Sequence, residues 1–237
     1  MENLSSDSNE EQCVPLSYRE QLIEILVFLF LIVPSLAYSF TITVSGGSFT
    51  SPLNALAIIL RDLSLILLVL FLLWHNREPV KKIGWTFLHG YLDILIGVIL
   101  FLPLFVFAGL LDYSLKSIGL SSISPTPTPF PASYIALTLT ILLVIVVAIA
   151  EETIFRGYII LRLHAVTGNL SAAVILSAVI FSIGHGYEGE AGVITIGVLG
   201  LIYALIYVWR KSLIAPMVLH FLQDFTTIVV IPFFLSG

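Results

Sequence analysis

Charged residues are scarce in this chain of 237 residues, because Asp, Glu, Lys and Arg together make up only 11% of it. Soluble proteins carry about 25%. Apolar residues make up 58% and the mean hydropathy is +1.07, which leaves no polar stretch long enough for a separate water-soluble domain. The scarcity of charge therefore excludes a soluble globular protein and indicates a protein that works within a lipid bilayer.

Cysteine and basic clusters are also scarce. Cys13 is the only cysteine, which excludes an intramolecular disulfide and a zinc site built from thiolates. The ten basic residues are spread thinly along the chain, so that nucleic acid is not an expected partner. Six of the fifteen acidic residues lie within residues 1–24. A secretory signal peptide begins with positive charge, so this acidic start argues against one.

Long apolar stretches dominate the rest of the chain. A helix of about 20 apolar residues spans a bilayer, because lipid offers no partners for unpaired backbone groups. The last such stretch predicts either one tilted helix or two shorter helices that meet near Asp224. We therefore predict an all-α, polytopic transmembrane bundle of seven to eight helices. The stretches lie at residues 21–40, 55–74, 91–111, 133–163, 171–186, 191–209 and 213–236.

The chain divides into three predicted regions. These are a polar acidic tail at residues 1–20, N-terminal transmembrane helices at 21–132 and a helical core at 133–237. Lys and Arg fall mainly after the second, fourth and sixth apolar stretches. Because Lys and Arg concentrate in cytoplasmic loops, this alternation places the N-terminus in the cytoplasm. We expect an integral, multi-pass membrane protein, in the cell membrane if the source is prokaryotic.

Ionisable side chains within apolar stretches are costly and mark candidate functional sites. Glu152 and Arg156 are four residues apart with the acid first, which favours an ion pair on a helix. The adjacent Glu151 points about 100° away, so it is left without a cation and suited to general acid–base work. Taken alone, this segment fits equally well a helix that ends at a solvated surface. Arg61 and Asp62 are interpreted as a structural or snorkelling pair.

Two further segments place histidine within apolar helices. Phe181 and His185 lie one turn apart on one helix face, and His220 and Asp224 do the same. At 1.5 Å per residue, the imidazoles, the Asp224 carboxylate and Glu151 all lie ~14 to ~21 Å from the basic end of the bundle. Three helices can therefore bring a carboxylate, two imidazoles and a second carboxylate to one buried site.

Such a set of groups suits hydrolysis. A carboxylate and an imidazole that share a water can deprotonate it for attack on a carbonyl, which predicts peptide hydrolysis within the membrane. Two histidines and one or two carboxylates also match the ligands of a catalytic zinc, for which Glu151, His185, His220 and Asp224 are the candidates. Spacing does not separate these mechanisms. The HExxH, GxSxG and GxGD signatures of other intramembrane proteases are missing from the sequence.

The motifs together resemble those of the CAAX protease and bacteriocin-processing (CPBP) membrane peptidases. This family includes Ras-converting CAAX endopeptidases and many bacterial Abi-type proteins. The resemblance covers about residues 133–230 and implies transmembrane helices around a cytoplasm-facing cavity. It also implies an endopeptidase that cuts near the C-terminus of its substrate. The family signature EExxxR, FxxxH and HxxxN/D corresponds to Glu151-Glu152 with Arg156, Phe181 with His185, and His220 with Asp224.

The resemblance also implies a role for each residue. Glu151 and His185 would activate water, while His220 and the last motif residue would stabilise the oxyanion. Many relatives have Asn at that last position, which can donate a hydrogen bond, whereas an ionised Asp224 only accepts. Asp224 is therefore protonated, orients His220 or binds a metal. The glutamate mechanism requires no cofactor, and zinc is the alternative.

The substrate and two rival functions stay open. A prenylated CAAX protein, a bacteriocin leader or another membrane-associated peptide fits the sequence equally well, and nothing in it predicts the oligomeric state. A bacteriocin-immunity or peptide-binding membrane protein would bind without cutting, but binding alone would not need Glu151 separate from the Glu152–Arg156 pair. A proton or ion transporter would relay protons through Glu, His and Asp. Clustering of these residues at one depth favours a reaction site over transport.

Overall fold

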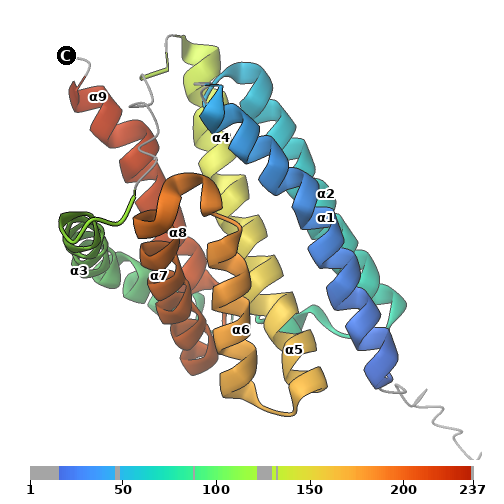
Figure 1. Cartoon of the computed structure of the whole chain (residues 1–237). Coiled ribbons are helices and arrows are strands. Elements are labelled where there is room, and N and C mark those ends of the chain that lie inside the picture. The colour runs from blue at the N-terminus through green and yellow to red at the C-terminus, as the bar shows by residue number, and fades with distance from the viewer. Residues whose placement is uncertain (1–15, 46–48, 88, 122–129, 132, 236–237) are drawn as a thin grey trace, which may run out of the picture.

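The structure is a computed structural model that describes residues 16–45, 49–87, 89–121, 130–131 and 133–235. Within these ranges the elements are helices joined by short connections, and there is no strand (Figure 1). Most of the predicted polar tail, including Cys13, lies outside the described residues. The main helices are α1 (Tyr18–Val44), α2 (Pro52–His75), α3 (Gly90–Ser117), α4 (Tyr134–Glu151), α5 (Ile160–Thr167), α6 (Leu170–Ile183), α7 (Gly189–Arg210), α8 (Ile214–Phe225) and α9 (Ile231–Leu235).

Two π-helical segments join successive α-helices into longer ones. Glu152–Ile159 joins α4 to α5, and Thr226–Val230 joins α8 to α9. The last apolar stretch therefore runs past Asp224 as one helix and not two. Within the described ranges, one shorter apolar helix, α6, accompanies six helices long and apolar enough to cross a membrane. Those six are Tyr18–Val44, Pro52–His75, Gly90–Ser117, Tyr134–Thr167, Gly186–Arg210 and Ile214–Leu235.

These helices confirm the predicted all-α polytopic bundle, with seven helices in the described part of the chain. Small polar residues set where the helices begin. The side chains of Ser17, Ser51, Ser133 and Asn169 each accept a hydrogen bond from a backbone N–H in the first turn that follows. Gly168 has φ +65° and ends α5. The division at residue 132 into N-terminal helices and core stays a prediction.

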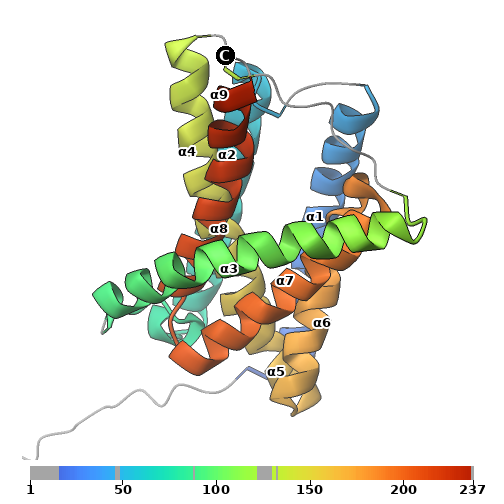
Figure 2. The ribbon, with the colours of Figure 1, turned by 90° about the vertical axis from the view of Figure 1, so that its left-hand side faces the viewer.

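Each helix packs on a small set of neighbours. α2 packs along α4, α1 contacts α5, α5 contacts α6, and α6 packs along α7, while α4 also contacts α8 (Figure 1). Figure 2 shows α3 lying across α7 and α8. Gly97 permits this crossing, because a Cβ atom there would lie 2.8 Å from Val218. The buried Asp93 accepts from Arg210 Nε at 2.7 Å, so that α3 is also tied to the end of α7.

The main hydrophobic core surrounds the π-helical segment, all of whose side chains are buried. Phe28 of α1 packs on Tyr158, with ring centroids 4.9 Å apart. Gly157 lets the backbone of the segment after α2 approach closely, since a Cβ atom at this position would lie 2.9 Å from the carbonyl oxygen of Ile83. The core therefore fixes the segment that carries Glu152.

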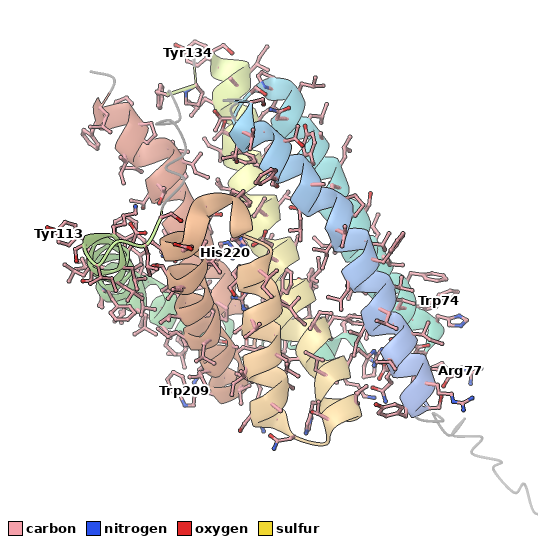
Figure 3. The ribbon with its side chains drawn as sticks, viewed as in Figure 1. Trp74, Arg77, Tyr113, Tyr134, Trp209 and His220 are labelled. Carbon is pink, nitrogen blue, oxygen red and sulfur yellow. The ribbon has the colours of Figure 1, made fainter. Side chains whose placement is uncertain are left out.

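The two ends of the bundle differ in their side chains. Trp74, Arg77 and Trp209 lie toward the lower end of the molecule in Figure 3, and Tyr134 lies at the opposite end. Trp and Tyr are enriched where a protein meets the two surfaces of a membrane. The helical ends that carry the predicted basic loops also lie toward the lower end in Figure 1. The arrangement suits a helical bundle embedded in a bilayer.

Candidate active site

The imidazole of His220 lies between the two adjacent carboxylates of the motif. Its Nδ1 atom is 2.9 Å from Oε1 of Glu152, and its Nε2 atom is 3.6 Å from Oε2 of Glu151. Figure 3 shows His220 in the interior of the bundle. The carboxylates come from the junction of α4 with the π-helical segment, and the histidine comes from α8. Divergence of the two acids thus brings them to opposite nitrogens of one ring.

Glu152 also forms the ion pair that its spacing predicts. Oε1 of Glu152 lies 3.1 Å from Nη1 of Arg156, and both side chains are almost completely buried. The Arg156 guanidinium lies 4.1 Å from the centroid of the Phe181 ring, a cation–π contact. Gly200 of α7 makes room for this stack, because a Cβ atom there would lie 3.2 Å from Phe181. Glu152 therefore fixes Arg156 and His220 together.

The helix is wound differently where these residues lie. Glu152–Ile159 is π-helical, with i→i+5 hydrogen bonds in place of the α-helical i→i+4 pattern. Short π-helical segments occur frequently at functional sites. No feature of the sequence predicted this winding. It sets the direction in which Glu152 and Arg156 leave the helix.

The Glu151 carboxylate, in contrast, is only loosely engaged. Its Oε2 atom is buried and forms no hydrogen bond with any described residue, and the side chain as a whole is 19% exposed. Oδ2 of Asp224 approaches the same side of His220, at 3.5 Å from Nε2. Both distances exceed that of a normal hydrogen bond. Glu151 thus keeps an acceptor atom available beside an imidazole.

His185 is connected to this group through Phe181. Its Nδ1 atom lies 2.9 Å from the Phe181 carbonyl oxygen, which can only accept, so Nδ1 carries the proton and Nε2 of the neutral ring is an acceptor. The Phe181 ring contacts both imidazoles, with centroids 4.6 Å from His185 and 6.4 Å from His220. The described contacts include no hydrogen bond or ion pair between His185 and Glu151.

The structure thus brings five of the six predicted site residues into direct contact and adds His185 through an aromatic ring. Residues 133–226, which include all six, match the family model for Rce1-like proteins, type II CAAX prenyl endopeptidases. The match covers 94 of the 237 residues, and over this length the chain is similar to that family. This finding confirms the resemblance to the CPBP peptidases. The chain gives no significant match to a curated protein or to a solved structure.

The match indicates a general class for this part of the chain. The family that it resembles consists of proteases, which implies protease activity and a peptide substrate, and the six long apolar helices support a multi-pass position in the membrane. The match covers the helices from α4 to α8.

The matched region also includes a residue near the site that the sequence analysis did not single out. Tyr203 of α7 donates a hydrogen bond to the side chain of Gln223, next to Asp224. Its ring centroid lies 6.2 Å from that of His220 and 5.7 Å from the Arg156 guanidinium carbon. The sequence offered one signal for it: Tyr203 lies three residues after Gly200 and therefore about one turn along the same helix. Tyr203 forms one wall of the site.

Metal binding was tested against the geometry of the side chains. Among the residues that the structure describes, no group of three or more His, Cys, Asp or Glu side chains is arranged to hold a metal ion. The Nδ1 atoms of His220 and His185 are engaged by Glu152 and by the Phe181 carbonyl, which leaves Nε2 of each ring open and is compatible with metal binding. Only the absence of a three-ligand group among the described side chains therefore argues against zinc. The residues present do not fit a three-ligand zinc site. No catalytic step is therefore derived through a metal.

Proposed function

We propose that this protein is an intramembrane endopeptidase that hydrolyses a peptide bond near the C-terminus of a membrane-associated substrate, with Glu151 as the general base. One observation carries the proposal. The Glu151 carboxylate has an available oxygen atom 3.6 Å from Nε2 of His220, whose ring is held from the other side by Glu152. The match to CAAX prenyl endopeptidases supports the same reaction class.

The first step needs a base and a nucleophile. A water molecule beside Glu151 gives a proton to the carboxylate while its oxygen attacks the carbonyl carbon of the scissile bond. Nε2 of His185 is a second acceptor for the same water, because Nδ1 of that ring already donates to Phe181. The C–N bond then breaks, and the proton held by Glu151 passes to the leaving nitrogen.

His220 is suited to stabilise the oxyanion formed by that attack. The Glu152 carboxylate, paired with Arg156, accepts from Nδ1 of His220 and fixes the orientation of the ring. His220 acts here as its imidazolium, in which both ring nitrogens carry a proton. Nε2 is then the donor that faces a reacting group, and a donor aimed at developing charge lowers the barrier. Asp224 lies on the Nε2 side at 3.5 Å and orients the ring without donating to the oxyanion.

The proposed mechanism uses no metal, and the substrate enters from the cytoplasm. The absence of a three-ligand group among the described side chains supports a mechanism without a metal.

Entry of the substrate from the cytoplasm is supported by the basic loops, which gather toward one end of the bundle. The substrate class that the family description favours is a prenylated protein with a CAAX C-terminus.

The test uses purified protein in detergent and a panel of fluorogenic peptides, prenylated and unmodified. Glu151→Gln should lower the rate by about 10²- to 10⁴-fold, the usual loss on removal of a general base. The matched control is Glu20→Gln, an exposed position in the capping box of α1, where Gln is also accepted. The proposal fails if Glu151→Gln cuts as fast as the control. Peptide binding without cleavage by the wild-type protein would indicate a binding function.

A further inference from the structure

Arg61 lies in the middle of the apolar helix α2, and the mechanism above does not use it. Its Nε atom donates to Oδ1 of Asp62 at 2.7 Å, and Asp62 is buried. The described residues offer no partner to its two Nη atoms, and the Arg61 side chain is 28% exposed. A cation at this depth of an apolar helix is costly, so unfilled donors there point to a ligand.

The packing of α2 brings Arg61 to the candidate site. Ile58 and Ile59 of α2 form one hydrophobic cluster with Leu143 of α4, and α2 also contacts the π-helical segment. The Arg61 guanidinium interacts electrostatically with Glu151 and Tyr187. Arg61 therefore flanks the proposed base from a helix that the family match does not include.

Arg61 lies at the border between the covered and the exposed sides of α2. Leu65, one turn after Arg61, and Asn54, two turns before it, are half-buried, and Tyr38 of α1 donates to Asn54 at 2.9 Å. Ala57 and Ser64, each one turn from Arg61, are exposed. The partly exposed Arg61 side chain therefore lies at the edge of the contact between helices.

The charges of the site indicate what Arg61 would bind. Glu151, Glu152 and Asp224 make the site acidic, and a negatively charged ligand would be repelled unless a cation met it. Arg156 cannot serve, because it is 1% exposed and stacked under Phe181. Arg61 has both terminal nitrogens available, and a guanidinium binds a carboxylate with two parallel hydrogen bonds.

We propose that Arg61 binds the free C-terminal carboxylate of the substrate through its Nη atoms, while Asp62 holds its Nε atom. This inference rests on the proposed function and adds a specificity to it. A peptide cut near its C-terminus carries a terminal carboxylate within a few residues of the scissile bond. Arg61 would select substrates whose chain ends, with a free carboxylate, within a few residues of the scissile bond. Substrates whose chain continues, or whose carboxylate is masked, would be cut more slowly.

The test compares two peptides of identical sequence, one with a C-terminal carboxylate and one with a C-terminal amide. The wild-type protein should prefer the acid by about 10- to 100-fold in kcat/KM, the value of a charge-assisted hydrogen bond. In the double variant Arg61→Gln/Asp62→Asn, the ratio should fall close to one, mainly through a higher KM for the acid. The double substitution leaves no unpaired charge in the apolar helix.

Further variants separate binding from structure. Arg61→Lys keeps one cation without the planar fork and should give an intermediate ratio, whereas Asp62→Asn keeps Arg61 and should retain most of the preference. Glu20→Gln should leave the ratio unchanged. In the wild-type protein, a short product-like peptide acid should inhibit competitively, and its amide should not. This inhibition test requires no variant to fold.

Two results would overturn the inference. Equal cleavage of acid and amide by the wild-type protein would do so, and so would an unchanged ratio in the folded double variant. If Glu151-dependent cleavage persists in either case, the proposed hydrolase function stands and only the role of Arg61 fails. Failure of the wild-type protein to cut any peptide would reject both proposals together.

Discussion

Nδ1 of His220 lies 2.9 Å from Oε1 of Glu152, the same atom that pairs with Arg156 at 3.1 Å. One buried carboxylate thus joins α8 to the π-helical segment and holds the imidazole of the proposed site. Glu151, the preceding residue, has no such structural contact, since its Oε2 atom forms no hydrogen bond with the described residues. We therefore propose that these two adjacent glutamates have different roles, one structural and one catalytic.

This division predicts different outcomes for the same substitution at adjacent positions. Glu152→Gln leaves Arg156 buried without a counter-charge and should cost ~3–5 kcal/mol of stability, whereas Glu151→Gln should stay folded and lose activity. Thermal unfolding in detergent, alongside the peptide assay, measures both effects. Glu152→Gln/Arg156→Met removes the stranded charge and should recover stability but not activity. Equal destabilisation by Glu151→Gln and Glu152→Gln would contradict the division.

Asp224 should tolerate replacement by Asn. It approaches Nε2 of His220 at 3.5 Å, longer than a hydrogen bond, so its negative charge is not strictly required to orient the ring. Asp224→Asn should lower kcat by about 10-fold or less, and Asp224→Leu, which cannot orient the ring, should lower it further. Steady-state kinetics of the two variants decide the point. Equal damage by Asn and Leu would mean that the carboxylate charge itself is needed.

Activity should not depend on a divalent metal ion. The described side chains form no group of three or more ligands that could hold a metal ion. Treatment with a strong chelator, followed by removal of the chelator, should leave the peptide-cleavage rate within about twofold of the untreated rate, a change of less than 0.5 kcal/mol. Loss of cleavage that added zinc restores would instead establish a metal-dependent mechanism.

The glycine beneath the cation–π stack should also affect the site. A Cβ atom at Gly200 would lie 3.2 Å from Phe181 and 3.3 Å from Nη2 of Arg156, so Gly200→Ala should displace both and cost about 1–3 kcal/mol. Gly109 of α3 is the matched control, since an added Cβ atom there meets nothing within 4 Å. Gly109→Ala should be neutral or stabilising. Similar unfolding temperatures and rates for the two variants would refute this account of Gly200.

The sequence was sufficient for the helices and for one ion pair, because these depend on local patterns. Apolar stretches near 20 residues gave the spans, and the spacing of four gave the Glu152–Arg156 pair. The π-helical winding and the contact between Glu152 and His220 could not be predicted. Both depend on how α4 and α8 are rotated against each other, and a single sequence does not encode that rotation in any local pattern.

The same limit applies to Arg61 and to α3. The sequence supports a pair between Arg61 and Asp62, and the structure contains it, but only the packing of α2 on α4 reveals that the pair lies beside Glu151. Hydropathy likewise identifies α3 as a span without indicating that it lies across α7 and α8. Residues that neither belong to a motif nor share a helix with one are found only from tertiary structure.

Glu78 forms ion pairs with Lys82 and Arg162, and these pairs should make the stability of the fold depend on pH. Partial burial opposes ionisation of Glu78, but hydrogen bonds from Arg162 and Lys82 outweigh it and hold the pKa of Glu78 below its ordinary value. A lowered pKa in the folded state stabilises the fold above the ordinary carboxylate pKa of about 4.3, and this contribution disappears as the pH falls through the lowered value. Glu78→Gln should therefore unfold at a lower temperature than wild type at pH 7. The difference should shrink as the pH is lowered below about 4. A difference that stayed constant or grew on acidification would show that Glu78 does not stabilise the fold through its charge.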